Sequence, residues 1–291
     1  MLQRLRSLAS PPAFFLATAP GARAPRLLAE DERHARKVLR LKRGALVIGL
    51  DGRGHRWPLR VKSAGAKALE LESAGPIEEV PVPGATGSIC PWIEVAVSWP
   101  RRNRVEPMLS RLAQLGASAI LPLDAEQRGP EEVEAAVDPA SERSGRIERI
   151  LREACKQCGR AWLPVIEPAR TPAALAEARR GAMLGLLEPR AALAFDTWLR
   201  SIRPAPIGPG TRERPIVLVI GPEGGFTSEE RKSLKEAGAS PLWLGPHVLR
   251  VETAAEAAMA IAAAVHATPP SVRDALDLEP EDDVANAELA P

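Results

Sequence analysis

An alternation of apolar runs and helical stretches from residue 93 onward constrains the fold of this chain more than any other feature. The apolar runs occupy residues 93–98, 117–123, 162–166, 182–187, 215–221 and 241–245. Strands that are apolar without alternation are buried on both faces, as in a parallel sheet covered by helices. Residues 104–116 and 142–159 have apolar side chains at helical spacing. We therefore expect an α/β domain with a mostly parallel sheet.

The first 75 residues have a different pattern. Short candidate strands at 45–50, 55–61 and 66–73 are separated by turn signals, notably Asp51-Gly52 and Gly54. A basic stretch before them, DERHARKVLRLKRG, predicts a short helix closed by Gly44.

These patterns divide the chain into four parts. We expect a small β-rich domain at 1–75, a linker rich in Pro and Gly at 76–90, the α/β domain at 91–268, and an acidic disordered tail at 269–291.

The charge is unevenly distributed along the chain. Residues 1–75 hold fifteen Lys and Arg against six Asp and Glu, a net charge of +9, whereas residues 269–291 carry −6. A basic front end is typical of a protein that binds a polyanion such as nucleic acid. A solvated surface in an arginine-rich proteome is the alternative explanation.

Composition narrows the class of protein further. With 291 residues, 45% of them hydrophobic, the chain has the composition of a soluble globular protein with a core. It contains no apolar run that could span a bilayer, and the N-terminal stretch only faintly resembles a signal peptide. Three cysteines argue against a disulfide framework and favour the cytoplasm.

The stretch LVIGPEGGFTSEE at 218–230 interrupts a candidate strand with glycines. It lacks the lysine of a Walker loop and the spacing of a Rossmann fingerprint, and Glu223 would repel a phosphate. Gly224 and Gly225 permit a turn with close backbone approach, and Thr227 and Glu230 fit a helix-capping box. A loop for a neutral or cationic ligand and a purely structural turn are both compatible with this pattern.

A second strand–loop–helix stretch, LGPHVLRVETAAEAAMAIAAAV at 244–265, is unusually polar between its strand and its helix. His247, Arg250, Glu252 and Thr253 lie there, so one of them is a candidate catalytic residue, although Glu252 and Thr253 also suit ordinary capping.

Two other clusters of side chains are candidate chemical sites. Arg101, Arg102 and Arg104 follow a strand and suit phosphate contacts, or a solvated turn. Cys155 and Cys158 fall at a helix end without further ligands, so we expect a structural role and no metal site.

Together, these motifs resemble the 16S ribosomal RNA uridine-N3 methyltransferases, the small-subunit methyltransferase E family of the knotted SPOUT superfamily. GPEGGFTSEE and LGPHVLRVETAA are similar to its signature pair, and HARKVLRLKRG, RVEPMLSRLAQLGASAILPL, EACKQCGR and LLEPRA are similar to its other motifs. The resemblance runs from about His34 to Ala264.

The resemblance implies an N-terminal PUA-like β-barrel for RNA, a C-terminal α/β domain with a deep trefoil knot, S-adenosylmethionine as cofactor, and a homodimer acting on ribosomal RNA or the 30S subunit. The expected cofactor-binding residues are Leu187, Glu188, Pro189, Gly221, Pro222, Glu223, Gly224, Gly225, Leu244, Gly245, Leu249 and Thr253. The expected RNA-binding residues are Arg36, Lys37, Arg40, Arg101, Arg102, Arg104 and Arg128.

The resemblance also suggests a mechanism, in which a cation near the uracil oxygens stabilises the charge that develops as N3 loses its proton. Arg250 is the candidate for this role. The chain departs from the family pattern at several positions, namely His247, Val251, Arg111, Gln114 and Arg102. These departures leave open a different RNA target, and a non-catalytic RNA-binding paralogue is the alternative from another class of protein.

Overall fold

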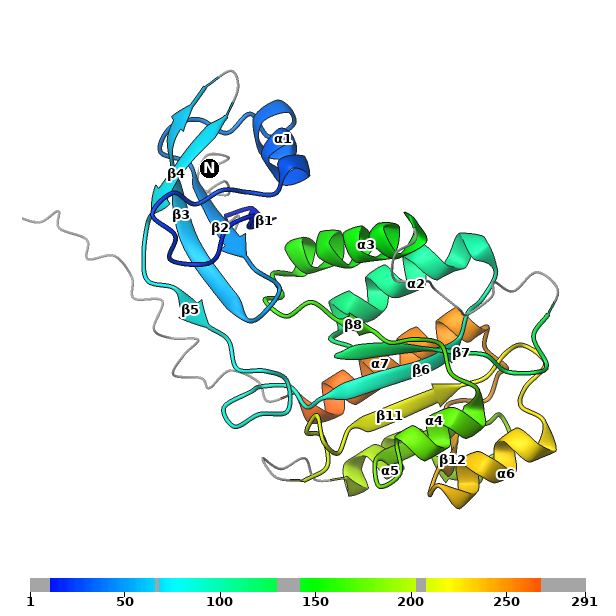
Figure 1. The fold of residues 1–291 in the computed structure, drawn as a ribbon. Coiled ribbons are helices and arrows are strands. Elements are labelled where there is room, and N and C mark those ends of the chain that lie inside the picture. Colours follow the sequence, from blue (N-terminus) through cyan, green and yellow to red (C-terminus); the bar gives the residue numbers. More distant parts are fainter. Residues whose placement is uncertain (1–10, 66–67, 130–141, 203–207, 268–291) are drawn as a thin grey trace, which may run out of the picture.

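The computed structural model describes residues 11–65, 68–129, 142–202 and 208–267, which form a small N-terminal module beside a larger α/β domain (Figure 1). The predicted acidic tail at 269–291 and the first two residues of the strand expected at 66–73 lie outside the described residues. No helix within the described ranges is long and apolar enough to cross a membrane.

The N-terminal module is built on a five-stranded sheet with one helix, α1 (Ala29–Lys37). Its strands are β1 (Ala13–Phe15), β2 (Leu46–Leu50), β3 (His55–Ala64), β4 (Leu69–Ser73) and β5 (Glu78–Glu79). They follow the order β1-β2-β3-β4, with β5 added to β3. β1 pairs with β2 in parallel, and the other pairs are antiparallel. β5 therefore falls within the stretch that the sequence suggested as a linker.

The core of this module follows the two-residue period of β3. Trp57, Leu59 and Val61 are buried on one face of β3 and pack with Phe14 of β1. Such alternation places every second side chain of the strand in the core.

The basic helix is shorter than expected. α1 ends at Lys37 and not near Gly44, because the chain turns through Arg40, which has a φ of 49°, and the amide of Leu41 donates to the carbonyl of Ala35. Leu41 then packs against the module's core, and this contact would be lost if the helix continued. Gly44, with a φ of 89°, lies in the turn into β2.

The larger domain has a seven-stranded sheet in which every strand pair is parallel. The strand order is β10-β12-β9-β11-β6-β7-β8. The strands are β6 (Ile93–Ser98), β7 (Ala119–Leu123), β8 (Val165–Ile166), β9 (Met183–Leu187), β10 (Leu193–Ala194), β11 (Ile216–Ile220) and β12 (Ser240–Trp243). The helices are α2 (Arg102–Leu115), α3 (Glu142–Cys158), α4 (Pro172–Ala178), α5 (Phe195–Ser201), α6 (Ser228–Glu236) and α7 (Val251–His266). The expected α/β fold with a parallel sheet is confirmed.

Helices cover both faces of this sheet (Figure 1). Ile216, Leu218 and Ile220 of β11 face the core formed with α2, α3, α5 and α7. Val217 and Val219 of the same strand face the core formed with α4 and α6. A strand buried on both sides explains why its sequence is apolar throughout.

Candidate functional site

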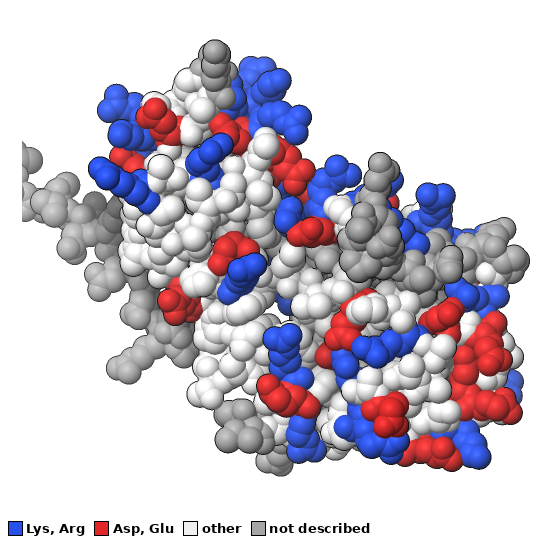
Figure 2. All heavy atoms as spheres, viewed as in Figure 1, with Lys and Arg blue, Asp and Glu red and all other residues white. Residues whose placement is uncertain are grey.

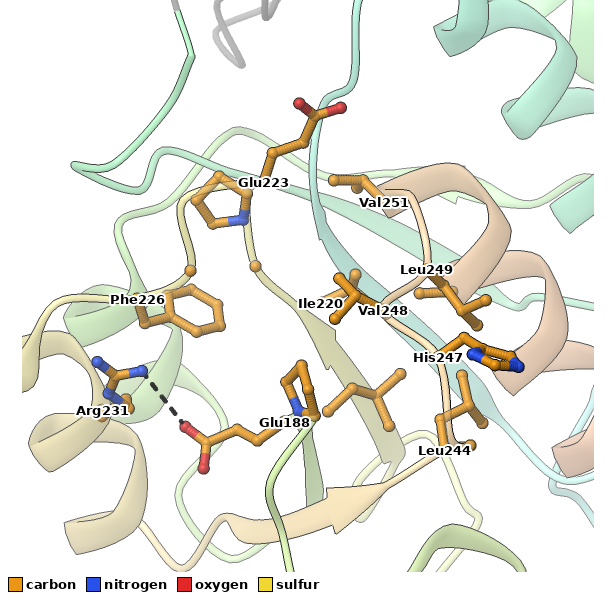
Figure 3. Close-up of a pocket in the computed structure, with 17 residues that line it drawn as sticks. Glu188, Ile220, Glu223, Phe226, Arg231, Leu244, His247, Val248, Leu249 and Val251 are labelled. Atoms are coloured by element: carbon orange, nitrogen blue, oxygen red, sulfur yellow. Dashed lines mark ion pairs between the residues drawn. The ribbon is translucent and has the colours of Figure 1, made fainter.

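A pocket lies at the carboxyl edge of the parallel sheet, where β9, β11 and β12 end beside one another (Figure 3). Its walls come from the loops that follow these three strands and from the first turn of α7, and they enclose a cavity of about 160 Å³. Ligands of α/β proteins commonly bind at this edge, outside the carboxyl ends of the strands.

The glycine loop after β11 is held in place by the cap of α6. The Thr227 hydroxyl accepts from the Glu230 amide at 3.2 Å, and the Glu230 carboxylate accepts from the Thr227 amide at 2.8 Å. The other oxygen of Glu230 accepts from the amide of Glu126, after β7, at 2.9 Å. The capping box expected from the sequence therefore also ties this loop to its neighbour.

Two glycines of this loop are constrained by close approach or by backbone angle. A Cβ atom on Gly221 would lie 2.8 Å from the ring of Phe226, and Gly225 has a φ of 77°. Both positions therefore exclude a larger side chain at the pocket wall.

The charged side chains that line the pocket are the carboxylates of Glu188 and Glu223 and the guanidinium of Arg231. The Oε1 atom of Glu188 is buried and has no hydrogen-bond partner among the described residues, and Nη1 of Arg231 lies 3.9 Å from it (Figure 3). A buried carboxylate oxygen without a donor is costly, so a ligand that brings a hydroxyl or an ammonium group would satisfy it.

Ten of the twelve residues expected at the cofactor line the pocket: Leu187, Glu188, Pro189, Gly221, Pro222, Glu223, Gly225, Leu244, Gly245 and Leu249. Gly224 does not line it, because this residue packs on Gln127: an added Cβ would lie 2.7 Å from the Gln127 carbonyl oxygen. Thr253 lies exposed on the first turn of α7, outside the pocket wall.

Further residues complete the pocket that sequence reasoning did not assign to it. These are Ile220, Phe226, Arg231, His247, Val248, Val251 and Ala254. Most flank the assigned residues in the same loops, so the loops themselves were the available signal. Arg231 lies one helical turn beyond the glycine loop, and no local pattern indicated it.

Arg250 lies beside the pocket without lining it. It is the N-cap residue of α7, it is exposed, and its neighbours Leu249 and Val251 both contribute to the wall. The next residue but one, Glu252, receives a hydrogen bond from Arg104 of α2 at 3.1 Å. That ion pair joins the start of α2 to the start of α7, so Arg104 is already engaged with a carboxylate.

The other residues expected to bind RNA lie in separate places. Arg36, Lys37 and Arg40 line a basic groove together with Lys42 and Arg43, which sequence reasoning had not singled out. Figure 2 shows Lys and Arg side chains gathered over the part of the N-terminal module that contains α1.

Besides Arg104, three arginines expected at the RNA lie in the larger domain and do not line this groove. Arg101 and Arg102 are exposed at the start of α2. Arg128 pairs with Asp124 after β7 at 2.8 Å.

The positions that depart from the family pattern have definite surroundings. His247 and Val251 form part of the pocket wall, while Arg111 of α2 pairs with Glu256 of α7 at 3.0 Å. Gln114 donates to Ser110 within α2.

Residues 88–263 match the family model of the RNA methyltransferase domain, which covers the whole parallel sheet and the pocket. The chain therefore belongs to the RNA methyltransferase family.

Within that family, the chain is similar to ribosomal RNA small subunit methyltransferase E of several bacteria. It is 28% identical to that of Synechocystis sp. over 228 residues, 78% of this chain and 68% of the relative. It is 29% identical to that of Mycobacterium bovis over 253 residues, 84% of this chain and 88% of the relative.

Solved structures share the fold. A methyltransferase from Legionella pneumophila, solved with bound S-adenosylmethionine, aligns with a TM-score of 0.70 at 23% identity, over 88% of this chain and 98% of the other. Ribosomal RNA small subunit methyltransferase E from Neisseria gonorrhoeae, bound to S-adenosylmethionine, gives 0.65 at 24% identity, over 86% and 96%.

Proposed function

We propose that this protein uses S-adenosylmethionine to methylate N3 of a uridine in small-subunit ribosomal RNA. The observation that carries the proposal is the pocket itself: its glycine loop has no lysine, and its wall holds a carboxylate oxygen to which none of the residues that the structure describes donates a hydrogen bond. The similarity to ribosomal RNA small subunit methyltransferases E supports the choice of RNA.

The residues of the pocket fit this cofactor. Leu187, Ile220, Phe226, Leu244 and Leu249 offer an apolar wall for an adenine ring. Glu188 would accept from ribose hydroxyls or from the amino group, and its negative charge suits a cationic ligand. The backbone of the glycine loop would hold the remainder without a cationic side chain of its own.

When bound, S-adenosylmethionine supplies a methyl group already activated by the adjacent sulfonium. The protein's own task is then to align the uridine and to stabilise negative charge on the uracil as its N3 proton leaves. Arg250, exposed beside the pocket wall, is the residue that we assign to this charge stabilisation.

The proposal includes the architecture that the family resemblance implies. We expect a PUA-like barrel in the N-terminal module, a trefoil knot around the pocket, and a homodimer in the cytoplasm. The order β12-β9-β11, with β9 between strands that come later in the chain, supports the knot. Exposed apolar side chains near the pocket support the dimer, since Val248 is 82% exposed and Leu249 38%. Light scattering would measure the dimer directly.

Two alternatives remain distinct from this proposal. His247 and Val251, which depart from the family pattern, lie in the pocket wall. The first alternative is therefore an enzyme that uses the same cofactor but methylates a different RNA. A non-catalytic RNA-binding paralogue would keep the basic groove but would not bind the cofactor.

Calorimetry with S-adenosylmethionine tests the two hypotheses in which the protein is an enzyme. We expect the chain to bind the cofactor, and an absence of binding would contradict both the leading proposal and the variant with another RNA target.

Arg250→Ala tests the proposed catalytic role. Because the side chain lies outside the cofactor wall, we expect cofactor affinity to stay within about twofold while the methylation rate falls roughly 100-fold, as for loss of a charge-stabilising donor. Near-normal methylation by this variant would exclude Arg250 from the role.

A further inference from the structure

The N-terminal module is joined to the methyltransferase domain through the end of α3 and the segment that follows it (Figure 1). Phe15 and Leu50 of the module form one apolar cluster with Cys155 of α3, and Leu163 packs against it. Burial raises the pKa of the Cys155 thiol to about 12, with Arg160 opposing this shift and Cys158 adding to it. Cys155 is therefore a neutral packing residue of this joint.

A buried ion pair crosses the same joint. Asp31, 2% exposed at the start of α1, accepts from the amide of Phe15 at 2.6 Å and from the ammonium group of Lys156. Burial lowers the pKa of Lys156, but hydrogen bonds and charges from Asp31 and Glu153 outweigh burial and raise it. Lys156 thus stays charged and holds α1 to α3.

Backbone contacts continue the joint beyond α3. The amide of Gly54 donates to the carbonyl of Ala161 at 3.1 Å, and the amide of Leu163 donates to that of Gly52 at 3.0 Å. A Cβ atom on Gly54 would lie 2.5 Å from the Trp162 ring. Gly52 and Gly54, which the sequence suggested as hairpin turns, therefore also allow residues 161–163 of the other domain to pack closely.

A side chain of the module completes these contacts. Arg56 donates twice to the carbonyl of Gly159, at 3.1 and 2.8 Å, and so satisfies an oxygen just after the end of α3.

The joint has a direct connection to the basic groove, because one helix belongs to both. α1 begins beside Asp31, which is held by Lys156, and it ends at Arg36 and Lys37, which line the groove. Arg36 lies five positions after Asp31 in the helix, an axial rise of about 7.5 Å. The orientation of the groove relative to the sheet therefore depends on how α1 is held against α3.

We propose that Lys156 and Asp31 are positioning residues for the methylation reaction. Their ion pair holds α1, and with it the basic groove, in one orientation relative to the methyl-donor pocket, so that RNA bound in the groove presents its uridine at the pocket. This inference rests on the proposed function. Within the Cys155-Lys156-Gln157-Cys158 motif, it assigns Lys156 a role in positioning, whereas metal binding and redox chemistry assign the motif none.

A double-mutant cycle on kcat/KM for small-subunit ribosomal RNA tests the coupling. One change is Lys37→Ala with Lys42→Ala in the groove, and the other is Lys156→Met with Asp31→Asn in the joint, which removes both charges together. If the joint aligns the groove with the pocket, the groove change lowers kcat/KM about tenfold in the parent. In the variant that lacks the ion pair, the same change lowers kcat/KM roughly twofold or less. The dissociation constant for S-adenosylmethionine stays unchanged in each.

Glu153→Gln is the matched control, because it removes the exposed partner of Lys156 at 2.6 Å and leaves Asp31 in place. We expect it to behave as the parent, and Lys156→Arg to retain most of the coupling. If the double change at the joint fails to fold, Arg56→Met opens the other end of the joint and should reduce the coupling in the same direction.

If the parent is active and the groove change lowers kcat/KM by the same factor with and without the ion pair, the positioning role is overturned. The proposed function is not affected by that result. A parent that neither binds S-adenosylmethionine nor methylates RNA would overturn the proposed function, and this inference with it.

Discussion

Glu188 places an acceptor oxygen in the wall of the pocket, and no residue among those described donates a hydrogen bond to it. Arg231 is the nearest cation, at 3.9 Å, and its side chain is 43% exposed, so its attraction is weakened by solvent. The carboxylate is therefore available to a ligand. We expect its negative charge to favour a cationic methyl donor over the neutral thioether that remains after transfer.

Glu188→Gln tests this preference at the residue scale. The neutral amide keeps the shape of the side chain but loses the charge, so affinity for S-adenosylmethionine should fall about tenfold or more, the usual cost of a lost charged hydrogen bond. Affinity for S-adenosylhomocysteine should fall less. Calorimetry measures both dissociation constants.

Glu229→Gln is the control, since Glu229 is exposed on α6 and does not line the pocket. Equal losses for the two ligands in Glu188→Gln would show that the charge plays no part in discrimination.

Single residues also show where sequence reasoning reached its limit. The glycine loop and Leu244, Gly245 and Leu249 were predictable because strand, loop and helix follow one another in the chain. Gly224 was assigned to the same pocket wall as Gly225, yet it packs against Gln127, which lies 97 positions away in the sequence. The pairing of Arg104 with Glu252 spans 148 positions and leaves no local pattern in the sequence.

At the scale of elements, α6 is the support of the pocket's glycine loop. The Thr227 hydroxyl accepts from the Glu230 amide in the first turn, and the Glu230 carboxylate accepts from the amides of Thr227 and Glu126. The loop is thus fixed between the end of β11 and the loop after β7.

Thr227→Ala should lower the free energy of unfolding by about 1 kcal/mol, the usual cost of losing a side-chain N-cap. Chemical denaturation followed by circular dichroism measures it. Thr227→Ser, which keeps the hydroxyl, should recover most of the loss. A Thr227→Ala protein as stable as the parent would mean that solvent caps the helix equally well.

Elements were predicted well wherever one local pattern determined them. The apolar strands of the parallel sheet and the alternating residues of β3 fall close to the positions that the sequence suggested. β1 was not foreseen, because a three-residue strand is defined only by its pairing with β2. The end of α1 was misplaced because the packing of Leu41 on the module's core decides it.

At the scale of the whole molecule, the structure combines a basic groove on one module with a pocket on the other that is lined by the carboxylates of Glu188 and Glu223. The charge distribution along the sequence was compatible both with a polyanion partner for the N-terminal part and with a solvated basic surface. The joint between the modules could not be predicted, since its ion pair links positions 125 residues apart.

The central claim is that this arrangement transfers a methyl group to uridine N3 of small-subunit ribosomal RNA. Its most direct test is mass-spectrometric mapping of methylated nucleosides in that RNA, from cells with and without the protein and after incubation of the unmethylated RNA with protein and S-adenosylmethionine. We expect one 3-methyluridine that is absent without the protein and restored by it. A methyl group on a different base, or identical maps in both cases, would contradict it.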